Sequence, residues 1–196
     1  MMMPVLRLND ATFVDLKTIS TWMGTKTPSE TIDAIVREKM EALDLERDID
    51  NGALTDENPE GDLVFEKAPG LSFTRILSAS VDNEKPEKIN WAGLLMKVIG
   101  AVKAKGLSGE KLVTELQIPA KESEYTMDGY KYQPELGISI QGQSAMDAWK
   151  EISRLAQKYH IPIEVRFQWR DNEKAQHPGK VGVIHAGWPT QDSASH

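Results

Sequence analysis

The stretch "PVLRLND" (Pro4–Asp10) begins the chain with alternating apolar and polar side chains. Such alternation predicts a β-strand, because successive side chains of a strand point to opposite faces. Leu6 and Leu8 then share one face, and the opposite face carries Val5, Arg7 and Asn9. A single short strand is not stable in water by itself. We therefore expect it to pair, either with the same strand of a second chain or with the edge of a larger sheet in its own chain.

Two helices are expected after this strand. Asn9 or Asp10 is suited to cap a helix that begins near Ala11. Apolar residues at spacings of three and four predict that this helix has one apolar face, formed by Phe13, Leu16, Ile19 and Met23. Gly24 follows directly, as is typical of the residue that ends a helix.

The motif "TPSE" (Thr27–Glu30) predicts the start of the second helix. Thr27 is expected to accept a hydrogen bond from the backbone three residues on, while Glu30 reaches back, and Pro28 suits the first helical position. The apolar face of this helix comprises Ile32, Ile35, Val36, Met40 and Leu43.

Residues 1–45 are too few to bury a sufficient core, so we expect this unit to form a homodimer through its N-terminal strand. The paired strands would bury Leu6 and Leu8 against four helices. A two-stranded ribbon fits the major groove of B-DNA, where Arg reads guanine and Asn reads adenine through paired hydrogen bonds.

The strand, the two helices and the "GTKTPSE" turn between them resemble the ribbon-helix-helix family of bacterial, plasmid and phage DNA-binding proteins, over residues 4–45. The resemblance implies a sequence-specific, homodimeric protein that binds double-stranded DNA, as a transcriptional repressor or an accessory factor of a plasmid, phage or mobile element. It implies base contacts by Val5, Arg7 and Asn9, and phosphate contacts by Lys26, Thr27 and Ser29. An antitoxin-like or partner-binding role is an alternative.

Charge is distributed unevenly along the 196 residues, whose formal net charge is −7. Residues 41–67 carry ten acidic and two basic residues, and residues 1–40 carry five of each. We expect 46–69 to be an acidic linker. The neutral N-terminal unit departs from the basic character common in DNA-binding modules. Specific binding would then depend on two dimers side by side or on the C-terminal domain.

Residues 70–188 are expected to form an α/β domain in which a small sheet packs on helices, which makes the chain an α+β protein. The role of this domain, including any small ligand or protein partner, is left open. Residues 189–196 are expected to be a disordered tail. The expected elements are a short strand at Leu63–Phe65, strands in 71–81, 130–142, 161–170 and 180–187, a helix from Trp91 to Gly106, a helix that Ser108 caps, and a helix that Ser144 caps.

The densest basic stretch consists of Lys97, Lys103, Lys105 and Lys111, and one interpretation of it is a secondary contact to DNA phosphates. Such a run is more often the solvated face of a helix. Four tryptophans of the domain are expected in core or edge packing, although Trp169 lies beside two arginines: Trp91, Trp149, Trp169 and Trp188.

Enzymatic chemistry finds little support in this sequence. "SGEK" (Ser108–Lys111) matches the Ser-x-x-Lys pattern of acyl-transfer enzymes, but a helix cap is the commoner reason for it. Four carboxylates favour, as an alternative, a metal-dependent nuclease or hydrolase: Glu122, Glu124, Asp128 and Glu135. The four histidines lack metal-ligand spacing, and His160 is expected at a helix end. We expect no metal and no cofactor.

Location in the cytoplasm is expected, because the chain has no cysteine and starts without the pattern of a secretory signal. It also lacks an apolar run of the roughly 18 residues that a membrane span requires.

Overall fold

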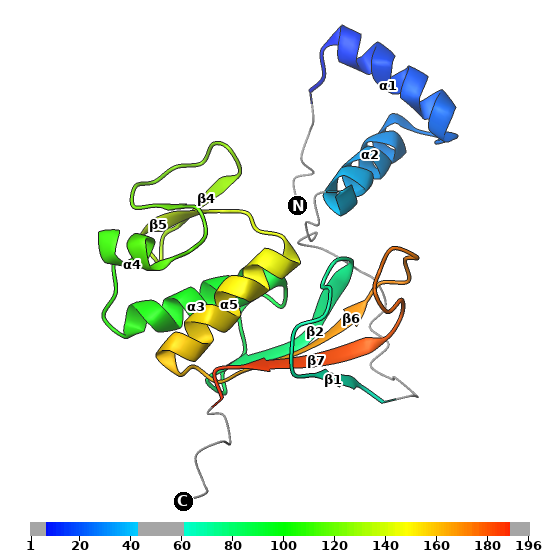
Figure 1. The fold of residues 1–196 in the computed structure, drawn as a ribbon. Coiled ribbons are helices and arrows are strands. Elements are labelled where there is room, and N and C mark those ends of the chain that lie inside the picture. Colours follow the sequence, from blue (N-terminus) through cyan, green and yellow to red (C-terminus); the bar gives the residue numbers. More distant parts are fainter. Residues whose placement is uncertain (1–6, 43–60, 189–196) are drawn as a thin grey trace, which may run out of the picture. The chain divides into compact units, whose positions relative to one another are not determined.

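The computed structural model describes residues 7–42 and 61–188. The chain divides into two compact units, at residue 43. The first unit contains two helices and the second contains the remaining described elements (Figure 1). The mixed α/β character expected from the sequence is confirmed.

The first unit is a pair of helices, α1 (Asp10–Met23) and α2 (Pro28–Ala42). Asn9 caps α1 by accepting a hydrogen bond from the Thr12 N–H at 2.8 Å. Gly24 ends it in the left-handed conformation, with φ 67°, which glycine adopts without a steric penalty. The caps at both ends of α1 were thus predicted correctly.

The larger sheet of the second unit has the strand order β1-β7-β6-β2. β1 runs parallel to β7, and the other two pairs are antiparallel. Apolar and polar residues alternate in the sequence of β6, and its odd-numbered side chains are buried while the even-numbered ones are more exposed. The strands are β1 (Leu63–Phe65), β2 (Thr74–Val81), β6 (Ile163–Trp169) and β7 (Val181–Ala186).

One face of this sheet is covered by α3 (Trp91–Ala104) and α5 (Ala145–Tyr159), which lie side by side (Figure 1). Asn90 and Ser144 cap these helices through their side-chain oxygens. The apolar face of α3 is buried and belongs to a continuous core with β6; it comprises Leu94, Leu95, Val98, Ile99 and Val102. His160 follows α5 as its left-handed end residue, in accord with the predicted helix-end position.

A smaller sheet has the order β3-β5-β4 and lies on the side of the helix pair away from the larger sheet (Figure 1). Its strands are β3 (Ala120–Lys121), β4 (Tyr130–Gln133) and β5 (Ile138–Gln141). A short helix, α4 (Glu110–Glu115), precedes it. Ile138 and Ile140 join the core, so both sheets share one apolar interior with the helix pair.

Several expectations need correction or fall outside the described residues. Ser108 does not cap α4: Gly109 occupies the cap position with φ 54° and ψ −133°, and no side chain caps the helix. The short strand expected at Leu63–Phe65 is present as β1, and its pairing with β7 places this end of the predicted linker in the larger sheet. Residues 4–6 of the predicted N-terminal strand lie outside the described residues, as do the linker at 46–60 and the tail, and Arg7–Asn9 have no strand structure.

Candidate nucleic-acid interface

The first turn of α2 has the hydrogen bonds that the "TPSE" motif predicted. The Glu30 N–H donates to Thr27 Oγ1 at 3.2 Å, and the Lys26 N–H donates to Glu30 Oε2 at 2.8 Å. The carboxylate therefore reaches one residue further back than in the ideal reciprocal arrangement. Because these bonds hold the turn, the position of the α2 N-terminus is well defined.

The turn between α1 and α2 is braced by three hydroxyl groups. Thr31 is fully buried, and its Oγ1 lies 2.5 Å from Thr25 Oγ1 and donates to the Thr27 carbonyl at 3.0 Å. Ser20 Oγ accepts from the Thr25 hydroxyl and donates to the Thr25 carbonyl, both at 3.0 Å. This network joins the end of α1 to the start of α2, and no sequence pattern had indicated it.

Lys26, Thr27 and Ser29 are all exposed at this helix start. Pro28 has no N–H, and among the described residues no acceptor is found for the Ser29 N–H. A free N–H and a lysine at a helix N-terminus are features that favour an anion such as a phosphate. The structure thus brings the three phosphate-contact candidates together.

The base-contact candidates are less completely described. Val5 lies outside the described residues, and Arg7 is exposed and bonded to none of them. Asn9 is also exposed, but its Oδ1 caps α1. Reading adenine requires both the oxygen and the nitrogen of the amide, so this cap competes with the role predicted for Asn9.

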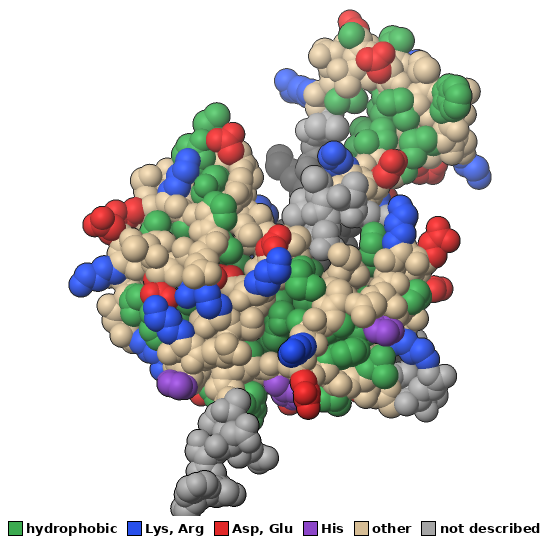
Figure 2. All heavy atoms as spheres, viewed as in Figure 1, with side chains coloured by type: hydrophobic (Ala, Val, Ile, Leu, Met, Phe, Trp, Pro, Cys, Tyr) green, Lys and Arg blue, Asp and Glu red, His purple; other side chains and the backbone are tan. Residues whose placement is uncertain are grey.

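Most apolar side chains of the two-helix unit remain at its surface. Leu16 is its one buried apolar residue among the side chains whose burial is described. Figure 2 shows apolar side chains exposed on this unit. On the apolar face predicted for α1, the side chains of Phe13, Ile19 and Met23 are 39–41% exposed.

The predicted secondary basic patch is divided by the fold. Lys97 pairs with Glu84 at 2.6 Å, and Lys103 donates to the Glu135 carbonyl at 2.6 Å. Lys105 and Lys111 are exposed, the first after α3 and the second on α4. Two of the four lysines therefore already have protein partners.

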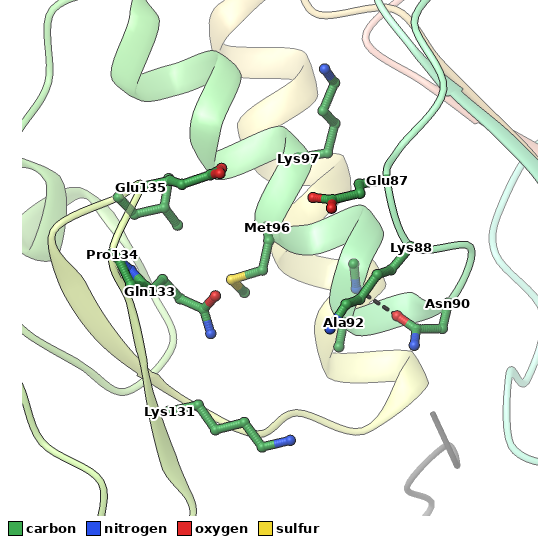
Figure 3. Close-up of a pocket in the computed structure, with 12 residues that line it drawn as sticks. Glu87, Lys88, Asn90, Ala92, Met96, Lys97, Lys131, Gln133, Pro134 and Glu135 are labelled. Atoms are coloured by element: carbon green, nitrogen blue, oxygen red, sulfur yellow. Dashed lines mark hydrogen bonds between the residues drawn. The ribbon is translucent and has the colours of Figure 1, made fainter. Parts of the chain in front are cut away.

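An open cavity of about 550 Å³ lies between α3 and the β4–β5 turn (Figure 3). Lys88, Lys97 and Lys131 line it together with Glu87 and Glu135. Because cations and carboxylates are mixed around it, its charge does not select one class of ligand.

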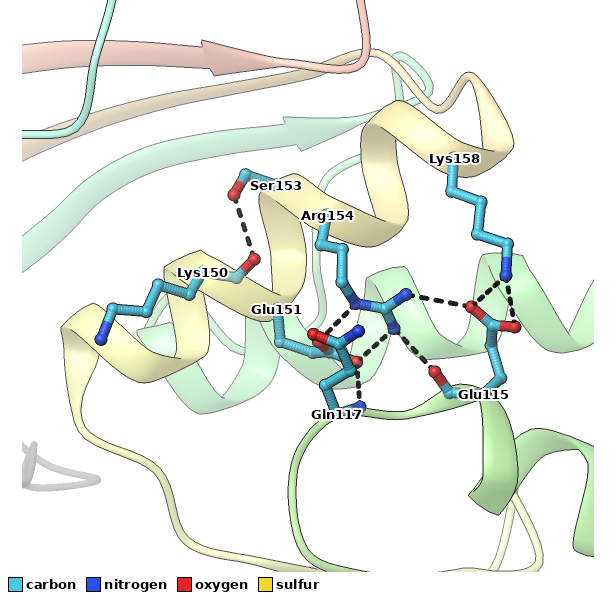
Figure 4. A network of polar contacts seen from close by, with 7 residues as sticks. All are labelled: Glu115, Gln117, Lys150, Glu151, Ser153, Arg154 and Lys158. Carbon is cyan, nitrogen blue, oxygen red and sulfur yellow. Dashed lines mark hydrogen bonds and ion pairs between the residues drawn. The ribbon is translucent and has the colours of Figure 1, made fainter.

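A partly buried ionic network joins α5 to the end of α4 (Figure 4). Glu151 is 3% exposed and accepts hydrogen bonds from two nitrogens of Arg154 and from the Gln117 N–H. Arg154 also contacts Glu115 at 3.1 Å, and Lys158 reaches the same carboxylate at 2.7 Å. The hydrogen bond from Lys158 lowers the pKa of Glu115 below its usual range. All charges in this network are paired, which indicates a structural role.

The carboxylates proposed for a nuclease do not gather. Asp128 accepts a hydrogen bond from the Tyr125 hydroxyl at 2.5 Å, whereas Glu135 lies on the β4–β5 turn. Within residues 7–42 and 61–188, no group of three or more His, Asp or Glu side chains is placed to hold a metal ion.

Three of the four tryptophans of the second unit are buried: Trp91, Trp149 and Trp169. Trp169 therefore offers no binding face, and its Nε1–H donates to the Gly70 carbonyl at 2.8 Å. Trp188 is 56% exposed. A cluster that the sequence did not indicate is formed by Lys121, Tyr125 and Tyr130.

No family model, curated protein or solved structure was found to match this chain. No helix in the described part of the chain is long and apolar enough to cross a membrane.

Proposed function

We propose that this chain is a sequence-specific DNA-binding protein that acts as a homodimer through residues 1–45, as a transcriptional repressor or an accessory factor. The main support is the two-helix unit, which buries Leu16, whereas Phe13, Ile19, Met23 and Val36 of its apolar faces stay exposed and Ile32, Ile35 and Met40 are half-buried. A second copy would cover this face, paired through the strand expected at residues 4–9, which would form only on association because Arg7–Asn9 have no strand structure in the single chain. The hydrophobic effect then favours dimerisation, because apolar area is removed from water.

In the proposed complex the strand pair enters the major groove and reads bases through Arg7 and Val5. Asn9 contributes to the same face only where its cap to Thr12 is released. The N-terminus of α2 holds a backbone phosphate through the Ser29 N–H and hydroxyl, with Lys26 beside it. Phosphate contacts fix the position on DNA and base contacts supply specificity. No covalent chemistry is required.

A binding selection on random duplex DNA tests the proposal and identifies the preferred site. Arg7→Ala should weaken binding to that site by about 1–3 kcal/mol and leave binding to unrelated DNA nearly unchanged. Ser29→Ala should weaken both, by up to about 1 kcal/mol, because a phosphate contact carries no sequence information.

Arg37→Ala is the matched control for Arg7→Ala. It also removes one exposed positive charge, but from α2, where Arg37 pairs with Asp33 at 3.0 Å. Equal losses of specificity for Arg7→Ala and Arg37→Ala would contradict the proposed role of Arg7. Sedimentation of the protein as a monomer when it is bound to its selected DNA would contradict the proposed homodimer.

A further inference from the structure

A pair of tyrosine rings encloses a cation beside the smaller sheet. The rings of Tyr125 and Tyr130 are nearly perpendicular, at 81°, with centroids 5.3 Å apart. The Lys121 ammonium lies 3.1 Å from the Tyr125 centroid and 4.7 Å from that of Tyr130. The negative face of an aromatic ring attracts a cation at such distances.

The surrounding hydrogen bonds hold this arrangement in place. Ser139 is fully buried; its hydroxyl accepts from the Tyr125 N–H and donates to the Ser123 carbonyl, each at 2.8 Å. Asp128 accepts from the Tyr125 hydroxyl at 2.5 Å and, through its own carbonyl, from Gln141 at 2.9 Å. The loop that carries Tyr125 is therefore fixed to β5, and the ring pair is preorganised.

The two ring faces are a poor environment for the primary ammonium of Lys121, because its N–H groups need hydrogen-bond acceptors. No hydrogen bond or ion pair joins it to any residue in the described part of the chain, and it lies against the two rings. A primary ammonium gives up hydrogen bonds to water when it lies against rings. A methylated ammonium has fewer N–H groups, and a quaternary ammonium has none. Both therefore lose fewer hydrogen bonds to water than a primary ammonium when they lie against the rings.

We propose that the Tyr125–Tyr130 pair is a binding site for a quaternary or methylated ammonium group, which Lys121 closes in this structure. Rotation of the Lys121 side chain toward solvent would admit the ligand. Glu122, Glu124 and Asp128 lie in the same loop, which carries no basic residue, so their charge favours a cation. An open cavity of about 630 Å³ lies on one side of Tyr130, where Glu124 and Thr126 also line it.

The proposal concerns the second unit alone and does not depend on DNA binding. Its chemistry fits a small free cation such as choline or a trimethylated lysine side chain of another protein. Both are tested, with unmodified lysine amide as the reference ligand.

The first test titrates full-length protein with tetramethylammonium and follows the ring-proton NMR signals of Tyr125 and Tyr130. The wild type should bind weakly, because Lys121 competes. Lys121→Ala should bind roughly tenfold more tightly, since it removes that competitor. Adding Tyr130→Leu to Lys121→Ala should abolish the binding.

Lys105→Ala is the matched control, because it removes an equal charge from an exposed position after α3. Equal affinities for Lys121→Ala, Lys105→Ala and the wild type would overturn the proposal, as would binding that survives Tyr130→Leu. If Lys121→Ala does not fold, Lys121→Gln replaces it. If neither folds, tyrosine signals of the wild type that do not move on titration overturn the proposal.

The second test compares choline, trimethyl-lysine amide and lysine amide on Lys121→Ala. Preference for choline indicates a small free ligand, and preference for trimethyl-lysine indicates a modified protein partner. Lysine amide binding as tightly as either one contradicts the proposal.

Discussion

Glu151 illustrates how strongly one residue affects the stability of the fold when its charge is buried. It lies on α5, and its carboxylate is satisfied by Arg154 and by the Gln117 backbone. Desolvation makes an unpaired buried charge costly, so removing one partner of such a pair is far more damaging than removing a surface pair. The neighbouring Lys150–Asp147 pair, at 3.0 Å, is largely exposed.

These two neighbours provide a matched comparison. Glu151→Ala should lower the free energy of unfolding by about 3 kcal/mol, because Arg154 and the Gln117 N–H lose an acceptor. Lys150→Ala should change it by less than about 0.5 kcal/mol. Urea denaturation followed by tryptophan fluorescence measures both. Similar losses for the two variants would contradict a structural role for Glu151.

Glu115 makes stability depend on pH. Its hydrogen bond with Lys158 lowers its pKa in the folded protein below the unfolded value. The stabilisation is therefore fully present above the unfolded pKa and is lost as the pH falls through the folded pKa. Glu115→Gln should thus destabilise the protein at pH 7 and have a smaller effect at pH 3.

Urea denaturation of both proteins at the two pH values tests this prediction. Glu124→Gln serves as the control, because Glu124 is exposed and forms no ion pair with the described residues. A Glu115→Gln effect that is equally large at pH 3 and pH 7 would falsify the linkage.

At the scale of elements, the turns at the ends of β6 and β7 depend on glycines in the left-handed region. Gly179 has φ 72° and Gly187 has φ 73°, so a side chain is disfavoured by backbone conformation at both. Their surroundings differ. A Cβ at Gly187 would lie 1.9 Å from the Ile161 carbonyl oxygen, whereas nothing lies within 4 Å of one at Gly179.

Substitutions at Gly179 and Gly187 distinguish the cost of backbone strain from the cost of a steric clash. Gly179→Ala should cost about 1 kcal/mol, from the positive φ alone. Gly187→Ala should cost at least about 2 kcal/mol more, because β7 must move away from the Ile161 backbone. Thermal unfolding monitored by tryptophan fluorescence gives the comparison. Equal costs would show that the turn after β7 moves without loss.

At the scale of the whole molecule, the two units differ in how much core they contain. The second unit buries a continuous interior between its helices and both sheets, whereas in the first the buried side chains, among those whose burial is described, are Leu16 and Thr31. Unit two has the core of an independently stable domain. The proposed dimer requires the stability of unit one to depend on association.

Dilution should therefore affect the two units differently. If unit one folds as a dimer, each tenfold dilution removes about 1.4 kcal/mol of its stability, while unit two is unaffected. Hydrogen exchange measured by mass spectrometry should quicken for residues 10–42 on dilution and stay constant for residues 163–169. Exchange that is independent of concentration in both segments would argue against dimerisation through unit one.

The sequence by itself predicted features that depend on a few neighbouring residues. The caps at Asn9, Gly24 and Ser144, the "TPSE" turn and the alternation of β6 belong to this group, because a cap or a period acts within one or two turns of the chain. The cap predicted at Ser108 was wrong, because Gly109 occupies the cap position of α4.

The tertiary structure alone decided which distant segments meet. Strand β1 pairs with β7, which lies more than a hundred residues later, and Glu151 becomes buried because the end of α4 lies beside α5. Lys121 meets two tyrosine rings because β5 aligns β3 with β4. Local sequence patterns do not predict such contacts, because strand pairing and core packing join side chains that are far apart in the chain.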